Sequence, residues 1–142
     1  MTNGSVHISA PVEAVVSVIS DIENYGAWTD GMSDIVVNKR DEVNRPVEVS
    51  FSVDTSALKD RVTLSYVWGT DFLAWNLVEG KTVTQLDGKY QWHSDGTGTQ
   101  VTYELTANVS MSIPSFMKRV AEKTIVTTAL QGLKKQVEAT SS

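Results

Sequence analysis

The chain has 142 residues, with 12 basic and 17 acidic side chains and a formal net charge of −5 at pH 7. That acidic balance argues against a nucleic-acid surface as the main partner, and the lack of cysteine excludes disulfides and thiol nucleophiles. No apolar run approaches the ~18 residues of a membrane span, and the N-terminus lacks the pattern of a signal peptide. We expect residues 1–142 to form one domain in the cytoplasm.

The N-terminal part predicts a strand followed by a helix. Val6 to Ser9 alternate apolar and polar side chains, as a short strand does. Pro11 suits the first position of a helix, because its missing N–H would have no partner there. One apolar stripe at helical spacing follows: Val12, Val15, Val16, Ile19 and Ile22. Tyr25, Trp28 and Met32 then fall in an irregular or helical connection.

The middle of the chain predicts an antiparallel sheet. Alternating segments are separated by turn-length links, which favours antiparallel pairing of consecutive strands. Gly88 reads as a possible β-bulge, and residues 94–98 carry a strong hairpin signal. The predicted strands are Ile35–Lys39, Pro46–Thr55, Val62–Trp68, Phe72–Val78, Thr82–His93 and Val101–Val109.

A long helix beginning at Pro114 and ending near Glu138 closes the chain, and its apolar face changes along its length. At ~100° per residue, the first half presents Phe116, Met117, Val120 and Ala121, continued by Thr124, Thr127, Thr128 and Gln131. The second half presents a different face, made of Val126, Ala129, Leu130, Leu133 and Val137. Either the first stripe covers a cavity while the second packs on a solid core, or the helix is kinked or contacts another subunit.

This order of elements and several local motifs resemble the START-like (SRPBCC) superfamily. Residues 6–15, VHISAPVEAV, resemble its V-x-I-x-A-P-x-E-x-V opening, and residues 21–28, DIENYGAW, resemble its D-x-x-x-Y-P-x-W segment. Residues 98–105, GTQVTYEL, resemble its G-T-x-V-x-Y-E-x strand, and Ile113-Pro114 with residues 130–134 resemble its closing helix. The resemblance covers nearly the whole chain.

The resemblance implies an α+β helix-grip fold, in which a curved seven-stranded antiparallel sheet surrounds a long C-terminal helix and two short helices follow the first strand. It also implies a cavity between sheet and helix. Members of this superfamily bind lipids, sterols, polyketides, quinones or plant hormones, and some are polyketide cyclases, aromatases or dehydratases. The fold alone does not choose among these functions.

Strand parity predicts an interior rich in aromatic rings. Alternate side chains of a strand face opposite sides of the sheet, and we take the apolar set as inward, choosing Leu73, Trp75 and Leu77 on the 72–78 strand. Tyr and Trp combine a large apolar area with one polar group, which suits an apolar ligand carrying a few oxygens. These rings could instead only fill the core. The predicted ligand-binding residues are Trp28, Phe51, Leu64, Tyr66, Trp68, Trp75, Tyr90, Trp92, Tyr103, Phe116, Val120 and Thr124.

The usual catalytic and metal-binding groups fall on the outward face. His7 and His93 are out of phase with their inward neighbours, so neither is placed to act as a general base, and two histidines on distant strands make a poor metal site. Glu48, Asp54, Asp87 and Glu104 share the outward phase. No phosphate-binding or dinucleotide-binding glycine motif is present. We therefore expect no metal and no cofactor.

Three functions fit these observations. The favoured one is a binder or carrier of a small hydrophobic or aromatic ligand, such as a lipid, polyketide or isoprenoid. The alternative is a polyketide cyclase, aromatase or dehydratase that uses pocket shape and the hydroxyls of Tyr66, Tyr90 and Tyr103 to orient a substrate. The third is an interaction protein that uses the outer sheet face or the two-faced helix. The chain is expected to be a monomer or a homodimer.

Overall fold

A computed structural model describes residues 1–29, 31–55 and 59–141. Its elements follow the predicted order. The strands are β1 (Thr2–Ile8), β2 (Met32–Arg40), β3 (Pro46–Asp54), β4 (Lys59–Trp68), β5 (Phe72–Glu79), β6 (Val83–Ser94) and β7 (Thr99–Val109). The helices are α1 (Val12–Ser20), the 3₁₀ helix η1 (Ile22–Ala27) and α2 (Ser115–Ser141).

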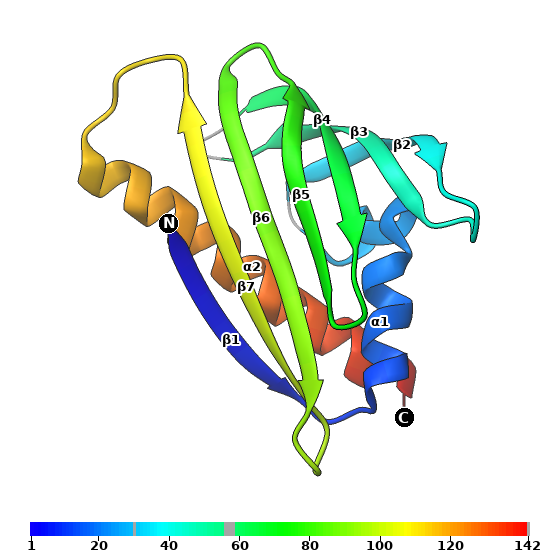
Figure 1. Ribbon diagram of the computed structural model, residues 1–142. Helices are drawn as coiled ribbons and strands as arrows, with labels where there is room; N and C mark the ends of the chain where they lie inside the picture. Colours follow the sequence, from blue (N-terminus) through cyan, green and yellow to red (C-terminus); the bar gives the residue numbers. More distant parts are fainter. Residues whose placement is uncertain (30, 56–58, 142) are drawn as a thin grey trace.

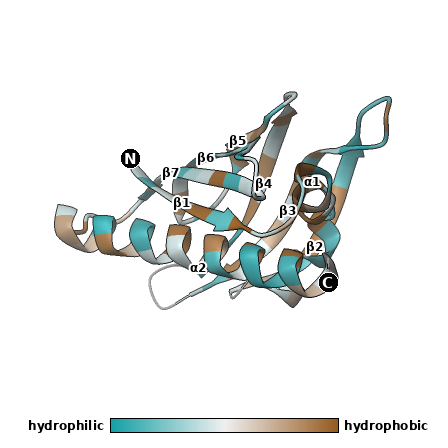
Figure 2. Ribbon diagram, turned by 90° about the horizontal axis from the view of Figure 1, so that it is seen from below, coloured by the Kyte–Doolittle hydropathy of each residue, from teal (hydrophilic) through white to brown (hydrophobic). Residues whose placement is uncertain are grey.

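The strands form one curved antiparallel sheet of seven strands in the order β1-β7-β6-β5-β4-β3-β2. Helix α2 lies along the concave side of the sheet, against β1, β7 and α1 (Figure 1). Seen from below, α2 runs across the open side of the sheet, and hydrophobic and hydrophilic residues alternate around it (Figure 2). This is the α+β helix-grip architecture that the family resemblance implies.

The solid part of the core lies beneath α1 and the second half of α2. Val15 and Ile19 of α1 are fully buried, as are Leu133 and Val137 of α2. The second apolar stripe of α2 is therefore a packing face, whereas Phe116 and Val120 of the first stripe are each 62% exposed.

Strand β1 begins earlier than its side-chain pattern predicts. The alternation marks residues 6–9, but pairing with β7 runs from Thr2, opposite Leu105, to Ile8, opposite Thr99. Asn3 and Gly4 are weak strand formers, so local propensity hides this part of the strand. A Cβ on Gly4 would lie 3.0 Å from Val126 Cγ1, which shows how closely β1 passes α2.

Two other local expectations are wrong. Met32 lies in β2 and not in the connection before it, because β2 starts early and pairs with β3 through several register shifts. Asp34, at one of these irregularities, has a positive φ of 50°. Gly88 is not a bulge: it pairs in regular register with Leu105 of β7 and Trp75 of β5.

Candidate functional site

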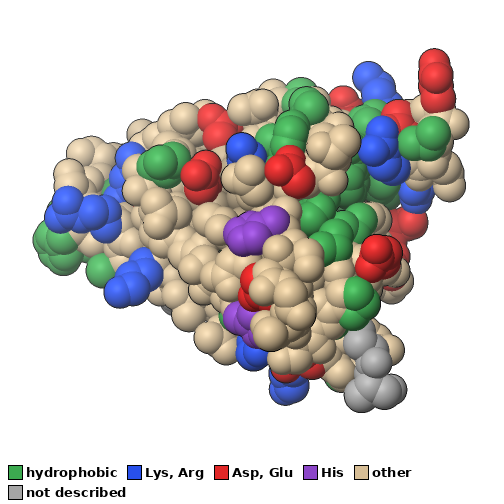
Figure 3. Space-filling view, turned by 60° about the horizontal axis from the view of Figure 1, so that its bottom comes forward, with side chains coloured by type: hydrophobic (Ala, Val, Ile, Leu, Met, Phe, Trp, Pro, Cys, Tyr) green, Lys and Arg blue, Asp and Glu red, His purple; other side chains and the backbone are tan. Residues whose placement is uncertain are grey.

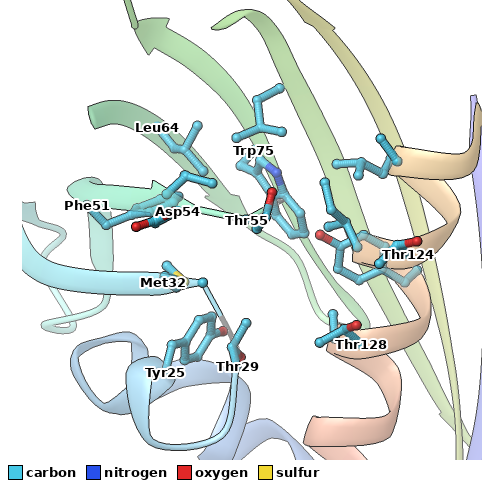
Figure 4. A pocket seen from close by; sticks show the side chains of 18 of the residues that line it. Tyr25, Thr29, Met32, Phe51, Asp54, Thr55, Leu64, Trp75, Thr124 and Thr128 are labelled. Carbon is cyan, nitrogen blue, oxygen red and sulfur yellow. The ribbon is translucent and has the colours of Figure 1, made fainter. Parts of the chain in front are cut away.

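A cavity of about 700 Å³ lies between the concave face of the sheet and the first half of α2. One wall consists of strand residues, including Phe51, Leu64, Tyr66, Trp75, Tyr90 and Tyr103. The other wall is helical and includes Phe116, Val120, Thr124 and Thr128. Figure 4 shows labelled side chains from the strands, from α2 and from the η1–β2 segment around this common space. The volume is in the range of ~300–1,000 Å³ that is usual for small-molecule sites.

The strand wall is built around Trp75 of β5. Its ring centroid lies 6.1 Å from that of Tyr66, 5.6 Å from that of Tyr90 and 5.5 Å from that of Tyr103. Tyr90 and Tyr103 meet edge to face at 4.7 Å. Register explains this cluster, because Trp75 pairs with Tyr66 across β4 and β5, and Tyr90 pairs with Tyr103 across β6 and β7. Tilted and edge-to-face rings are the favoured aromatic geometry.

Gly88 makes room for the Trp75 indole. A Cβ at Gly88 would lie 2.3 Å from Trp75 Cζ2 and 2.5 Å from Cε2, closer than real side chains approach. The glycine therefore has a steric role, since only a residue without a Cβ lets the ring lie flat on β6. The sequence signal at Gly88 marks a close side-chain approach to the strand backbone.

The helical wall is open to the outside. Phe116, Met117 and Val120 line the cavity, yet each side chain is at least half exposed. Thr124 Oγ1 donates a 2.9 Å hydrogen bond to the Val120 carbonyl, so this hydroxyl is already engaged. The first stripe of α2 thus covers a cavity, which is the first of the two arrangements that its sequence allowed.

The η1–β2 segment forms a third side of the cavity, with Tyr25, Thr29 and Met32 pointing toward it (Figure 4). Tyr25 donates its hydroxyl to the Ile19 carbonyl. Thr29 Oγ1 is the buried side-chain polar atom of the described chain that has no hydrogen-bond partner.

The cavity tyrosines are uncharged groups at any ordinary pH. Burial raises the pKa of Tyr66 and of Tyr90, and each is raised further by charge repulsion from neighbouring tyrosines. Burial alone raises the pKa of Tyr103. Burial is also the largest cause of the raised pKa of Tyr25. These phenols can therefore donate hydrogen bonds, but they are poor sources of a phenolate base.

Nine of the twelve predicted ligand-binding residues line this cavity: Phe51, Leu64, Tyr66, Trp75, Tyr90, Tyr103, Phe116, Val120 and Thr124. Parity on β5 is also as chosen from the sequence, since Leu73 is fully buried and Trp75 is 6% exposed. Tyrosine and tryptophan rings from β4 to β7 thus meet on the predicted face of the sheet.

The structure places Trp28, Trp68 and Trp92 away from the cavity wall. Trp68 Nε1 donates a 2.7 Å hydrogen bond to the Pro46 carbonyl at the end of the sheet. Trp92 is buried on the inward face, but on the stretch of β6 that pairs with Val101 and lies nearer the hairpin than Tyr90 does. Parity fixes the face of a side chain but not its position along the strand.

Trp28 lies beside the cavity and supports its edge. Its ring contacts that of Tyr25 at 4.8 Å between centroids. A Cβ on Gly132 would lie 2.3 Å from the Trp28 carbonyl oxygen, so the connection after η1 packs directly on α2. Tyr25, and not Trp28, presents its ring to the cavity.

Sequence reasoning missed several lining residues, among them Thr29, Met32 and Leu86, whereas Thr128 lies on the helix stripe that the sequence indicated. Strand parity predicts Asp54 on the outer sheet face, whereas the residue lies at the cavity mouth with its side chain 70% exposed. Asp54 is the last residue of β3 and pairs with Lys59 at the end of the β3–β4 ladder.

The expected surface positions of the histidines agree with the structure. His93 is exposed, and His7 Nε2 lies 3.1 Å from Asp95 Oδ2 and 3.1 Å from Thr97 Oγ1 in the β6–β7 hairpin. Figure 3 shows histidine side chains at the surface of the face that it presents. Neither histidine lines the cavity. Within the described residues, no group of histidine and acidic side chains is arranged to hold a metal ion.

Glu122 is a buried carboxyl group that the sequence analysis did not single out. It is 2% exposed, and it accepts 2.7 Å hydrogen bonds from Thr2 Oγ1 and from the Ala107 N–H. It therefore ties α2 to β1 and β7, and it does not line the cavity. Helical phase could have found it, because Glu122 falls on the same face as Val126 and Leu133.

The cavity wall offers shape and neutral hydrogen-bonding groups. Among the described lining residues, the tyrosines and Asp54 are the ones with titratable side chains. Lysine, arginine and histidine do not occur in that described wall. Such a site can bind and orient an apolar molecule.

A family model described as polyketide cyclase/dehydrase and lipid transport matches residues 2–138. No curated protein sequence matches the chain significantly. Within the described residues, no helix is both long enough and apolar enough to cross a membrane.

Solved structures with the same fold span nearly the whole chain. A START superfamily protein from Mycobacterium smegmatis superposes with a TM-score of 0.90 at 18% identity, over 98% of this chain and 97% of that one. The Zhui aromatase/cyclase from Streptomyces sp. R1128 superposes with a TM-score of 0.76 at 13% identity, over 96% and 92%.

A STAR-related lipid transfer protein from Xanthomonas axonopodis has a TM-score of 0.66 at 22% identity, over 95% of this chain and 84% of that one. At these identities the likenesses show the fold, which is the helix-grip fold of START-like proteins. Because the family model spans almost the entire sequence, this chain belongs to the polyketide cyclase/dehydrase and lipid transport family.

Proposed function

We propose that the protein binds or carries a small hydrophobic or aromatic molecule in the cavity beneath the first half of α2. The observation that carries this proposal is the cavity itself, about 700 Å³ in volume and walled mainly by apolar and aromatic side chains. A folded interior normally closes such space, because unfilled volume forfeits packing energy. A cavity of this size is therefore a feature that function explains better than stability does.

The mouth of the cavity also favours ligand exchange. Phe116, Met117 and Val120 leave large apolar areas in contact with solvent. Exposed apolar side chains grouped at one place commonly mark a site that becomes covered by a ligand or a partner. In this proposal, a ligand that enters the cavity buries the inner sides of these residues against itself.

Native mass spectrometry of freshly purified protein tests the proposal, by comparison with the denatured mass. We expect a bound molecule that is lost on denaturation, or uptake of an added apolar fluorophore by ligand-free protein. Thr128→Trp, which places an indole in the cavity wall, should reduce uptake at least tenfold. Thr127→Trp is the matched control, since Thr127 is exposed and does not line the cavity. Equal uptake by both variants would place the binding site elsewhere.

The cyclase or aromatase alternative is favoured by one observation, the neutral phenols of Tyr66, Tyr90 and Tyr103 on the cavity wall. Aligned hydroxyls could hold a polyketone in a folded shape and stabilise a developing oxyanion. The described wall supplies no buried acid, histidine or arginine to move protons, which favours binding over catalysis. Turnover of a poly-β-ketothioester into a cyclised product, lost in Tyr103→Phe, would support the enzyme.

A further inference from the structure

Four polar groups of the cavity wall have no hydrogen-bond partner in the described chain. Tyr66, Tyr90 and Tyr103, here called the phenol cluster, line the cavity, and their hydroxyls make no hydrogen bond to the described chain. The Trp75 indole N–H, in the middle of these rings, likewise has none. Tyr25 differs, because its hydroxyl is bound to the Ile19 carbonyl.

These unpartnered groups are within reach of a ligand. Thr29 Oγ1 is the one side-chain polar atom of the described chain that is both sealed from solvent and unpartnered. The hydroxyl oxygens of the phenol cluster are therefore accessible from the cavity that they line. Buried polar groups normally find a partner, so accessible donors in an apolar cavity are matched by a ligand or by water.

The chemistry of these groups is mainly that of donors. An indole N–H can only donate, and a phenol donates one hydrogen bond while accepting others. Because burial raises the pKa of Tyr66 and of Tyr103, these hydroxyls keep their protons at any ordinary pH. A ligand that complements this wall carries hydrogen-bond acceptors on an apolar frame.

The charges around the cavity disfavour an anionic ligand. No cation occurs on the described wall, and the acid at the mouth, Asp54, is 70% exposed and pairs with the exposed Lys59 at 3.8 Å, so the mouth holds no unpaired cation from this pair. The chain as a whole carries a net charge of −5. An anion moved from water into an apolar site loses hydration that neutral donors do not fully replace, unless a cation pairs with it.

We propose that the cavity selects uncharged ligands with ketone-like or quinone-like oxygens, which accept hydrogen bonds from the phenol cluster and the Trp75 N–H, and that it rejects carboxylates. This inference rests on the proposed binding function, and it narrows the ligand to a class. Free fatty acids fall outside this class at neutral pH, whereas polyketones, quinones and other neutral carbonyl compounds fall inside it.

Matched fluorescent probes on one naphthalene frame test this selection. The ketone probe is 6-propionyl-2-(dimethylamino)naphthalene, the anionic probe is 6-(dimethylamino)-2-naphthoate, and the hydrocarbon probe is 6-propyl-2-(dimethylamino)naphthalene. Fluorescence titration of ligand-free protein at pH 7.5 gives the dissociation constant of each. We expect the ketone to bind at least tenfold more tightly than the carboxylate.

Tyrosine-to-phenylalanine variants identify the groups responsible. Tyr66→Phe, Tyr90→Phe and Tyr103→Phe each remove a hydroxyl without a protein partner, so the fold should remain intact. At least one of these variants should raise the dissociation constant of the ketone probe threefold to tenfold. The dissociation constant of the hydrocarbon probe should change by less than twofold. Tyr25→Phe is the matched control, because it removes a hydroxyl that is already bound to the backbone. The ratio of the dissociation constants of the ketone and hydrocarbon probes should therefore be the same as in the unmodified protein.

The outcomes separate this inference from the proposed function. If the carboxylate binds as tightly as the ketone, or if no phenol-cluster variant changes the ketone-to-hydrocarbon ratio, the selection is refuted while binding in the cavity stands. If an ammonium analogue on the same frame binds more tightly than the ketone, the proposed neutrality is refuted. If none of the probes binds, the hydrocarbon included, the binding function fails as well.

Discussion

Replacing Glu122 separates its hydrogen-bonding role from that of its charge. In Glu122→Ala, the Ala107 N–H loses its acceptor and the Thr2 hydroxyl loses its partner. An unsatisfied buried donor costs ~1–3 kcal/mol, and the lost buried methylene groups add ~1–2 kcal/mol. Thr2 is partly exposed, so its hydroxyl can turn toward water. We expect Glu122→Ala to lower the free energy of unfolding by about 3 kcal/mol.

Glu122→Gln should cost far less. The amide oxygen can accept from the Ala107 N–H, and the amide nitrogen can donate to Thr2 Oγ1, because a hydroxyl both donates and accepts. We expect a loss of about 1 kcal/mol or less. Denaturant unfolding followed by tryptophan fluorescence measures both variants, with an unchanged m-value as the check on two-state behaviour. If Gln is as damaging as Ala, the carboxyl group acts through its charge, and the hydrogen-bonding account is wrong.

Three further substitutions test other parts of the structure. Gly88→Ala puts a Cβ 2.3 Å from Trp75 Cζ2, so we expect ~2 kcal/mol of destabilisation and weaker probe binding; unchanged affinity would contradict the role of Trp75. Asp60 Oδ2 accepts hydrogen bonds from three backbone N–H groups of the β5–β6 turn. Burial raises the pKa of Asp60, but these hydrogen bonds outweigh that effect and hold the pKa below its usual 3.8. Asp60→Asn should lower the free energy of unfolding by ~2 kcal/mol at pH 7. The difference between variant and unmodified protein should shrink as the pH falls below 3.8, because a carboxyl group with a lowered folded-state pKa contributes stability only while it is ionised. A difference that does not depend on pH would count against this explanation. Trp68→Phe removes the hydrogen bond to Pro46 and should lower stability by ~1–2 kcal/mol with probe affinity unchanged, whereas a parallel loss of affinity would place Trp68 at the cavity after all.

The alternation of side chains predicted much of the strand wall. Phe51, Leu64, Tyr66 and Tyr103 were assigned to one face because apolar and polar residues alternate along their strands, and all four line the cavity. The same rule grouped Trp92 with them, although it lies beyond the cavity. Alternation along a strand predicts which face of the sheet a side chain lies on. It does not predict how far the cavity extends along that strand, because this depends on where α1 and α2 cross the sheet.

Long-range contacts account for what the sequence did not reveal. Asn3 and Gly4 are poor strand formers, yet they extend β1 because β7 supplies a complete antiparallel partner. Thr29 and Met32 line the cavity because the η1–β2 segment folds back toward α2, and no local pattern encodes that return. Glycine within a strand can indicate either a bulge or a close approach of another group, and at Gly88 only the position of the Trp75 ring decides between these two.

The change of face along α2 links stability to the proposed function. From Val126 onward, the inward side chains are buried against the sheet and α1, and they hold the helix in place. Before that point, Glu122 anchors the first half of the helix to β1 and β7 with two hydrogen bonds. Phe116 and Val120 on the opposite side are thereby left free of the core and line the cavity. The same helix thus holds to the sheet through the Glu122 hydrogen bonds and its second apolar stripe, while its first stripe forms one wall of the proposed ligand site.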